Sequence, residues 1–190
     1  VVFAKEDKDG NTEENEKMSQ EELLMFVDEV EQEGTIDEDE GDLIRNVIEF
    51  TETQAEDILT HRVDLEAVPM NADKEEISKK FQDTQFSRLL VYEESIDNII
   101  GFILQKDFYT VDGITKASVK KLVKPVIFTQ KTEMVNDLLK KLQVNKTHIA
   151  VVLDEYGGTL GIVTMEDILE ELVGEIWDEH DEVVEDFKKL

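Results

Sequence analysis

The chain repeats part of itself, and this repeat limits the possible folds more than any other feature. The sequence GFILQKD at residues 101–107 returns as GIVTMED at residues 161–167, 60 residues further along. At the same offset, SRLLVY at 87–92 matches THIAVV at 147–152. A long segment that occurs twice indicates two copies of one supersecondary unit rather than a solenoid. We therefore expect two similar halves, the first copy and the second copy.

The second copy is predicted to run strand, helix, strand, turn, strand, helix. Its strands are apolar, its first helix is amphipathic, and glycines occupy the turn. In the first helix of each copy, Phe81 matches Leu142 at an offset of 61. We therefore expect the second copy to lack one residue between this helix and the next strand. The expected strands are 126–128, 149–153 and 160–163, and the expected helices are 133–143 and 164–173.

Two helices are expected before the first copy. Ser19 and Glu22 form a capping box, and apolar residues follow with helical spacing. A second helix is expected from near Asp37. The predicted fold is α/β (α+β), with two tandem β-α-β-β-α units in a pseudo-two-fold arrangement after a helical lead-in. The expected divisions are a flexible lead-in (1–18), a helical segment (19–59), the first unit (60–112), the second unit (113–174) and an acidic C-terminal linker (175–190).

The net charge of the chain is −27 at pH 7, with 47 acidic residues against 20 Lys and Arg. This balance argues against nucleic acid, which requires a basic face. It favours cations, or a partner that arrives with cations, although a solvated acidic surface would give the same charge. Cysteine is absent, which excludes disulfides and thiolate sites. No nucleophile elbow or P-loop motif occurs, so we expect no enzyme activity.

The start of the last helix, TMED at residues 164–167, has two interpretations. Thr164 and Asp167 have the spacing of a capping box. The same helix N-terminus could hold a ligand, because its free amides suit a phosphate and a carboxylate can accept from a ribose diol. A helix terminus contributes about 0.3–1 kcal/mol to an anion, whereas micromolar binding requires about 8 kcal/mol. A ligand site here would therefore also need apolar burial and further phosphate donors.

The segment DEYGGTLGIVTMEDILEELVGEI, at residues 154–176, carries a family resemblance. With the repeat, it resembles the cystathionine-β-synthase (CBS) domain pair of the CorC/hemolysin-C-type family, which includes cyclin-M-like magnesium transporters. The resemblance implies a regulatory module on the cytoplasmic side of the cell membrane, attached to a membrane domain that transports magnesium or cobalt. It also implies a homodimer of CBS pairs and an adenine nucleotide, ATP or AMP, bound with Mg²⁺.

The resemblance also implies site residues. Thr164 matches the threonine on the phosphate side and Asp167 the carboxylate that binds ribose. Thr60 matches a threonine of the same cleft, and Leu89, Leu90 and Val91 match the strand that packs on adenine. His61 and Leu90 stand where the family usually has proline. No residue is assigned to a metal ion.

The first copy has Leu104 where the second has Thr164, so the hydroxyl is lost. We therefore expect one good nucleotide site and one degenerate cleft near Asp107, Ile149 and Ala150. Lys106 is a candidate phosphate cation there, although an exposed surface lysine is the simpler interpretation. The alternative function is a ligand-free structural dimerisation module of the same membrane protein.

Overall fold

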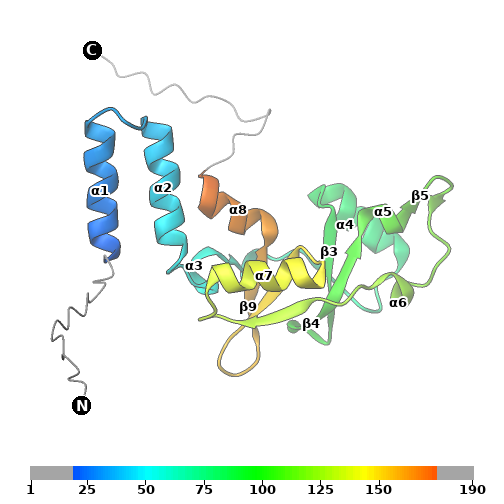
Figure 1. Cartoon of the computed structure of the whole chain (residues 1–190). Helices are drawn as coiled ribbons and strands as arrows, with labels where there is room; N and C mark the ends of the chain where they lie inside the picture. Colours follow the sequence, from blue (N-terminus) through cyan, green and yellow to red (C-terminus); the bar gives the residue numbers. More distant parts are fainter. Residues whose placement is uncertain (1–18, 175–190) are drawn as a thin grey trace, which may run out of the picture.

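The computed structural model describes residues 19–174, so the expectations for 1–18 and 175–190 lie outside the described residues. Two antiparallel helices, α1 (Gln20–Gln32) and α2 (Glu38–Phe50), stand beside a body formed by the two copies (Figure 1). Among the described helices, none has both the length and the apolar character needed to cross a membrane.

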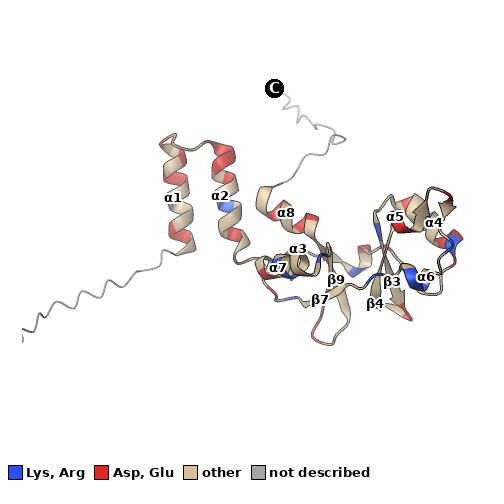
Figure 2. Ribbon diagram, turned by 45° about the vertical axis from the view of Figure 1, so that its right-hand side comes forward, with Lys and Arg blue, Asp and Glu red and all other residues tan. Residues whose placement is uncertain are grey.

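Each helix of the α1–α2 hairpin begins with a capping box. Ser19 and Glu22 cap α1, and Asp37 and Glu40 cap α2, as expected for the first. Acidic residues occur along both helices (Figure 2). One cation joins them, because Arg45 of α2 pairs with Asp28 and Glu31 of α1 and with Asp42 of its own helix.

The second copy has a four-stranded sheet in the order β1-β9-β8-β7. Strands β7 and β8 are parallel, and β8 and β9 form an antiparallel hairpin. Helices α7 and α8 bury Leu138, Leu142 and Ile168 in one core with the sheet, together with Phe50 of α2. The elements are β1 (Thr60–His61), β7 (Ile127–Gln130), α7 (Val135–Asn145), β8 (Ile149–Leu153), β9 (Thr159–Thr164) and α8 (Met165–Val173).

The first copy repeats this plan with the sheet β2-β3-β4. Its core is aromatic, since the buried Phe81 and Phe108 have ring centroids 5.5 Å apart. The elements are η1 (Arg62–Asp64), β2 (Ala67–Pro69), α4 (Lys74–Thr84), β3 (Arg88–Glu93), β4 (Ser95–Leu104), α5 (Gln105–Phe108), β5 (Tyr109–Thr110), β6 (Gly113–Ile114) and α6 (Val119–Leu122). The short helix α3 (Ala55–Ile58) comes before them and buries Ala55 in the core of the second copy. The predicted fold class is confirmed.

Each copy completes the sheet of the other. Thr60, at the start of the first unit, pairs with Ile162 of β9. Lys124, in the first part of the second unit, exchanges two backbone hydrogen bonds with Phe102 of β4, at 2.8 and 3.0 Å. The approach is so close that a Cβ at Gly161 would overlap the carbonyl oxygen of Thr60. The glycine that opens each repeated motif is therefore required by this crossing.

The strand register corrects one expectation. Leu90 lies opposite Phe102, and Val151 lies opposite Ile162. The strands before the hairpin therefore match at an offset of 61 (90 to 151), as the upstream helices do, and not at 60. The residue that the second copy lacks lies within the β8–β9 hairpin and not between helix and strand. Side chains alternate between the two faces of a strand. An alignment of β3 with β8 at an offset of 60 therefore matches residues that lie on opposite faces.

A third core joins the copies. Leu90, Ile99 and Phe102 of the first copy pack with Val126, Ile149 and Val151 of the second. The surfaces that face each other come from equivalent strands, which gives the pseudo-two-fold arrangement expected from the repeat. The side of this interface near the N-terminus of α8 is hollowed.

Candidate functional site

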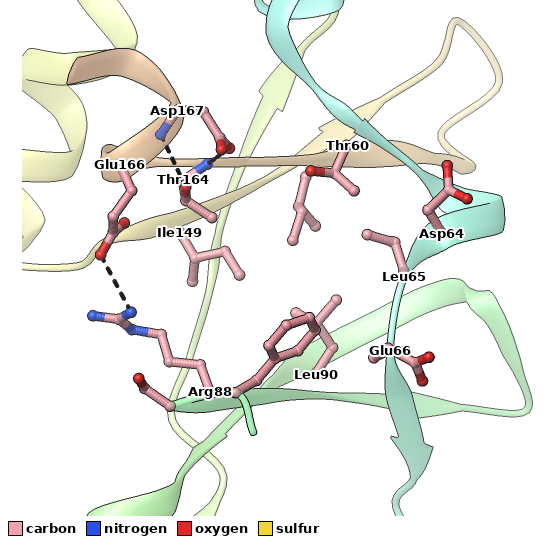
Figure 3. A pocket seen from close by; sticks show the side chains of 13 residues that line it. Thr60, Asp64, Leu65, Glu66, Arg88, Leu90, Ile149, Thr164, Glu166 and Asp167 are labelled. Carbon is pink, nitrogen blue, oxygen red and sulfur yellow. Dashed lines mark hydrogen bonds and ion pairs between the residues drawn. The ribbon is translucent and has the colours of Figure 1, made fainter. Parts of the chain in front are cut away.

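A cavity of about 460 Å³ lies between the two copies. The segment that follows α3, the start of β3 and the junction of β9 with α8 all contribute to its wall (Figure 3). The lining residues are Thr60, Asp64, Leu65, Glu66, Phe86, Ser87, Arg88, Leu90, Ile149, Ile162, Thr164, Glu166 and Asp167.

Thr164 and Asp167 form the capping box and line the cavity at the same time. The Thr164 Oγ1 accepts from the amide of Asp167 at 3.2 Å, and the Thr164 amide donates to Asp167 Oδ2 at 2.7 Å (Figure 3). The threonine hydroxyl keeps its proton for donation, and a carboxylate has more acceptor sites than one hydrogen bond uses. The two interpretations of this motif are therefore compatible.

The middle of the cavity is apolar. Leu65, Leu90 and Ile149 extend into the space between the polar groups (Figure 3), and Ile162 also lines it. Phe86 contributes an aromatic side chain that is 51% exposed. Such a wall suits a flat heteroaromatic group. The sequence analysis missed Phe86, although an aromatic residue just before the first buried strand was a signal for it.

Four carboxylates line the cavity: Asp64, Glu66, Glu166 and Asp167. Arg88 is the one Lys or Arg among the thirteen lining residues. Its Nη1 lies 3.5 Å from Glu166 Oε1 across the cavity, between the two copies. A phosphate therefore meets both a cation and a surplus of negative charge. Among residues 19–174, no group of three or more His, Asp or Glu side chains is placed to hold a metal ion.

The structure gathers four of the six residues expected at the nucleotide site: Thr60, Leu90, Thr164 and Asp167 all line the cavity. Leu89 and Val91 do not line it. Both are fully buried in the core of the first copy, against α4, because alternate residues of β3 point to opposite faces of the sheet. Of this strand, Arg88 and Leu90 face the cavity.

The residues expected at the second cleft have different surroundings. Ile149 lines the cavity that contains Thr164, and Ala150 is fully buried in the core of the second copy. Asp107 pairs with Lys124 at 2.7 Å. Lys106 is exposed, and Leu104 gives α5 no side-chain cap. Asp107, the equivalent of Asp167, is therefore paired with a lysine of the chain itself.

Known proteins have a similar sequence and a similar architecture. A family model described as CBS domain matches residues 119–174. The solved CBS domain of the bacterial CNNM/CorC family Mg²⁺ transporter is 36% identical, with a TM-score of 0.75, covering 85% of this chain and 100% of that one. Its complex with ATP is 36% identical, with a TM-score of 0.66, covering 72% and 99%. The hemolysin C homolog of Rickettsia rickettsii is 38% identical over 146 residues, 76% of this chain and 49% of that protein.

The exchanged sheets and the cavity between them define the described residues as a CBS-domain pair. The chain spans less than half the length of curated relatives such as the hemolysin C homolog. It belongs to the CorC/hemolysin-C family, whose members include the CNNM/CorC Mg²⁺ transporter, as the resemblance implied.

Proposed function

We propose that this CBS pair binds an adenine nucleotide, ATP or AMP, in the cavity between its copies and regulates an attached membrane domain that transports divalent cations. One observation carries the proposal: a single apolar cavity brings Thr60 together with Thr164 and Asp167, which lie far from it in the chain. The ATP complex of a 36% identical CBS domain supports it.

Each part of a nucleotide has a suitable partner in the cavity. The base would pack on Leu90 and Ile162, a ribose hydroxyl would donate to Asp167, and a phosphate would accept from Thr164 and Arg88. Burial of about 150 Å² of base contributes on the order of 4 kcal/mol. A helix N-terminus adds roughly 0.3–1 kcal/mol. The remainder of the approximately 8 kcal/mol needed for micromolar affinity comes from hydrogen bonds and charge at the phosphates.

Mg²⁺ is part of the proposal because the cavity is acidic. A metal-free triphosphate adds several negative charges beside four carboxylates. Mg²⁺ bound to the phosphates removes much of this repulsion and needs only a few protein ligands, because it keeps several waters. We assign no metal ligand in the protein itself.

A path from the cavity toward the proposed membrane domain runs through α8. This helix begins at the cavity, just after its cap Thr164, and packs on α2, since Ile168 shares a core with Phe50. α2 in turn packs on α1 (Figure 1). A ligand that shifts the N-terminus of α8 therefore acts on the lead helices. We propose that the module works as a homodimer on the cytoplasmic side of the membrane.

Isothermal titration calorimetry of the chain with ATP and with AMP, each with and without Mg²⁺, tests the proposal directly. A saturable heat is expected for at least one nucleotide. The second candidate, a ligand-free dimerisation module, is favoured by one observation, the engagement of Arg88 by Glu166. That candidate holds if neither nucleotide binds or raises the melting temperature at millimolar concentration.

A further inference from the structure

The cavity contains an ion pair between two of its lining residues, Arg88 and Glu166. Arg88 of β3 and Glu166 of α8 approach to 3.5 Å, and the two residues come from different copies (Figure 3). The Arg88 side chain is 27% exposed and that of Glu166 is 61% exposed. Glu166 lies two residues after Thr164, and both side chains line the cavity.

A guanidinium has five N–H donors and can pair with two anions, but the two negative charges then repel each other. Arg88 is the cation that the lining offers to a phosphate, and the carboxylate of Glu166 already compensates part of its charge. A phosphate that binds Arg88 must displace this carboxylate or share the guanidinium with it. Glu166 has a second basic neighbour, since the Nδ1 of His148 lies 3.9 Å from the same Oε1. The side chain can therefore leave Arg88 without losing every basic contact.

The repeated unit does not require this ion pair. Lys106 of the first copy is the equivalent of Glu166 in the second. Ile149 of the second copy is the equivalent of Arg88 in the first, because Arg88 lies opposite Leu104 and Ile149 lies opposite Thr164. Neither partner of the ion pair is repeated. The pair is thus a property of this one cavity and not a structural element of the CBS unit.

We propose that Glu166 is an internal competitor for the nucleotide phosphate, an autoinhibitory carboxylate that holds Arg88 until a ligand displaces it. The inference rests on the proposed function, because it assumes that a nucleotide enters this cavity. Removal of the Glu166 charge then strengthens phosphate binding through Arg88. An exposed pair of this kind is worth an affinity change of about two- to fivefold.

The test measures AMP binding by calorimetry in EDTA, so that no divalent cation contributes. The variants are Glu166→Gln, Arg88→Gln and the double variant. Glu170→Gln is the matched control, because it removes the same charge from an exposed position one turn further along α8. Glu166→Gln is expected to raise the affinity for AMP about two- to fivefold, and Glu170→Gln to change it much less. In the Arg88→Gln background, the effect of Glu166→Gln is expected to fall to that of the control.

Each other outcome is decisive. Unchanged or weaker AMP binding by Glu166→Gln, when the wild type binds, overturns the competitor role and leaves the proposed function standing. An equal gain in the Arg88→Gln background shows general charge relief and also overturns it. If the wild type binds neither AMP in EDTA nor ATP with Mg²⁺, the proposed function itself fails. Melting curves of all variants establish that each is folded.

Discussion

The amide of Thr164 donates a 2.7 Å hydrogen bond to the carboxylate of Asp167, and both side chains line the cavity between the two copies. One pair of residues therefore ends a strand, starts a helix and forms part of a candidate ligand site. The structural and functional consequences of changing either residue can be separated, because another capping box in the same chain lies away from the cavity.

Thr164→Ala is expected to weaken ATP binding at least tenfold, since it removes a phosphate donor as well as a cap. Ser19→Ala is the matched control: it removes the cap of α1 and touches no cavity residue. Each variant should lose about 0.5–2 kcal/mol of stability. Calorimetry and thermal melting measure the two effects. Equal ATP affinities for both variants would mean that Thr164 is only a cap.

Mg²⁺ is expected to strengthen ATP binding and to have a smaller effect on AMP. The reason is charge, because ATP brings more negative charge than AMP to a cavity with four carboxylates. Titration of each nucleotide with Mg²⁺ and with EDTA checks this. The same ratio of affinities for both nucleotides would contradict an electrostatic role of the metal ion.

One nucleotide is expected per chain, because Lys124 already pairs with Asp107 at the pseudo-equivalent position. Asp107→Asn should leave the calorimetric stoichiometry and the ATP affinity unchanged. A stoichiometry near two in the wild type that falls to one in this variant would show that the second cleft also binds.

Gly161→Ala is expected to destabilise the fold by about 1–3 kcal/mol, because its Cβ would overlap the backbone of Thr60. The same shift would move Thr60 away from β9 and weaken ATP binding. Gly34→Ala is a useful control: a Cβ there meets no atom within 4 Å, although the φ of +72° still strains the backbone. Chemical denaturation compares the two. A smaller loss for Gly161→Ala than for Gly34→Ala would contradict the close crossing.

The ion pair of Lys131 with Glu155 predicts a pH effect on stability. The hydrogen bond from Lys131, 2.6 Å long, lowers the pKa of Glu155, and the lysine charge acts in the same direction. A lowered pKa in the folded state stabilises the fold above the unfolded value, about 4.3 for glutamate, and this contribution disappears as the pH falls through the folded value.

Lys131→Met should therefore lower the melting temperature slightly at pH 7 and less at pH 3. Lys79→Met, at an exposed position of α4, serves as the control. A difference between wild type and Lys131→Met that grows toward low pH would show that the sign is wrong.

The sequence by itself determined the features that depend on neighbours along the chain. The capping boxes at Ser19 and Thr164 join residues three positions apart, so their geometry follows from local spacing. The repeat likewise predicted two similar units. These interactions need no knowledge of which distant segment lies opposite.

Only the tertiary structure decided which residues meet across the two copies. Whether Leu89 or Leu90 faces the cavity depends on register, and the residue that the second copy lacks in the β8–β9 hairpin shifts the equivalent positions of the two strands by one. The crossing of Thr60 onto β9 and the approach of Arg88 to Glu166 also join segments remote in sequence. Burial of the core shared by the two copies fixes how their sheets lie against each other. These contacts depend on that packing, and the sequence around each residue does not predict them.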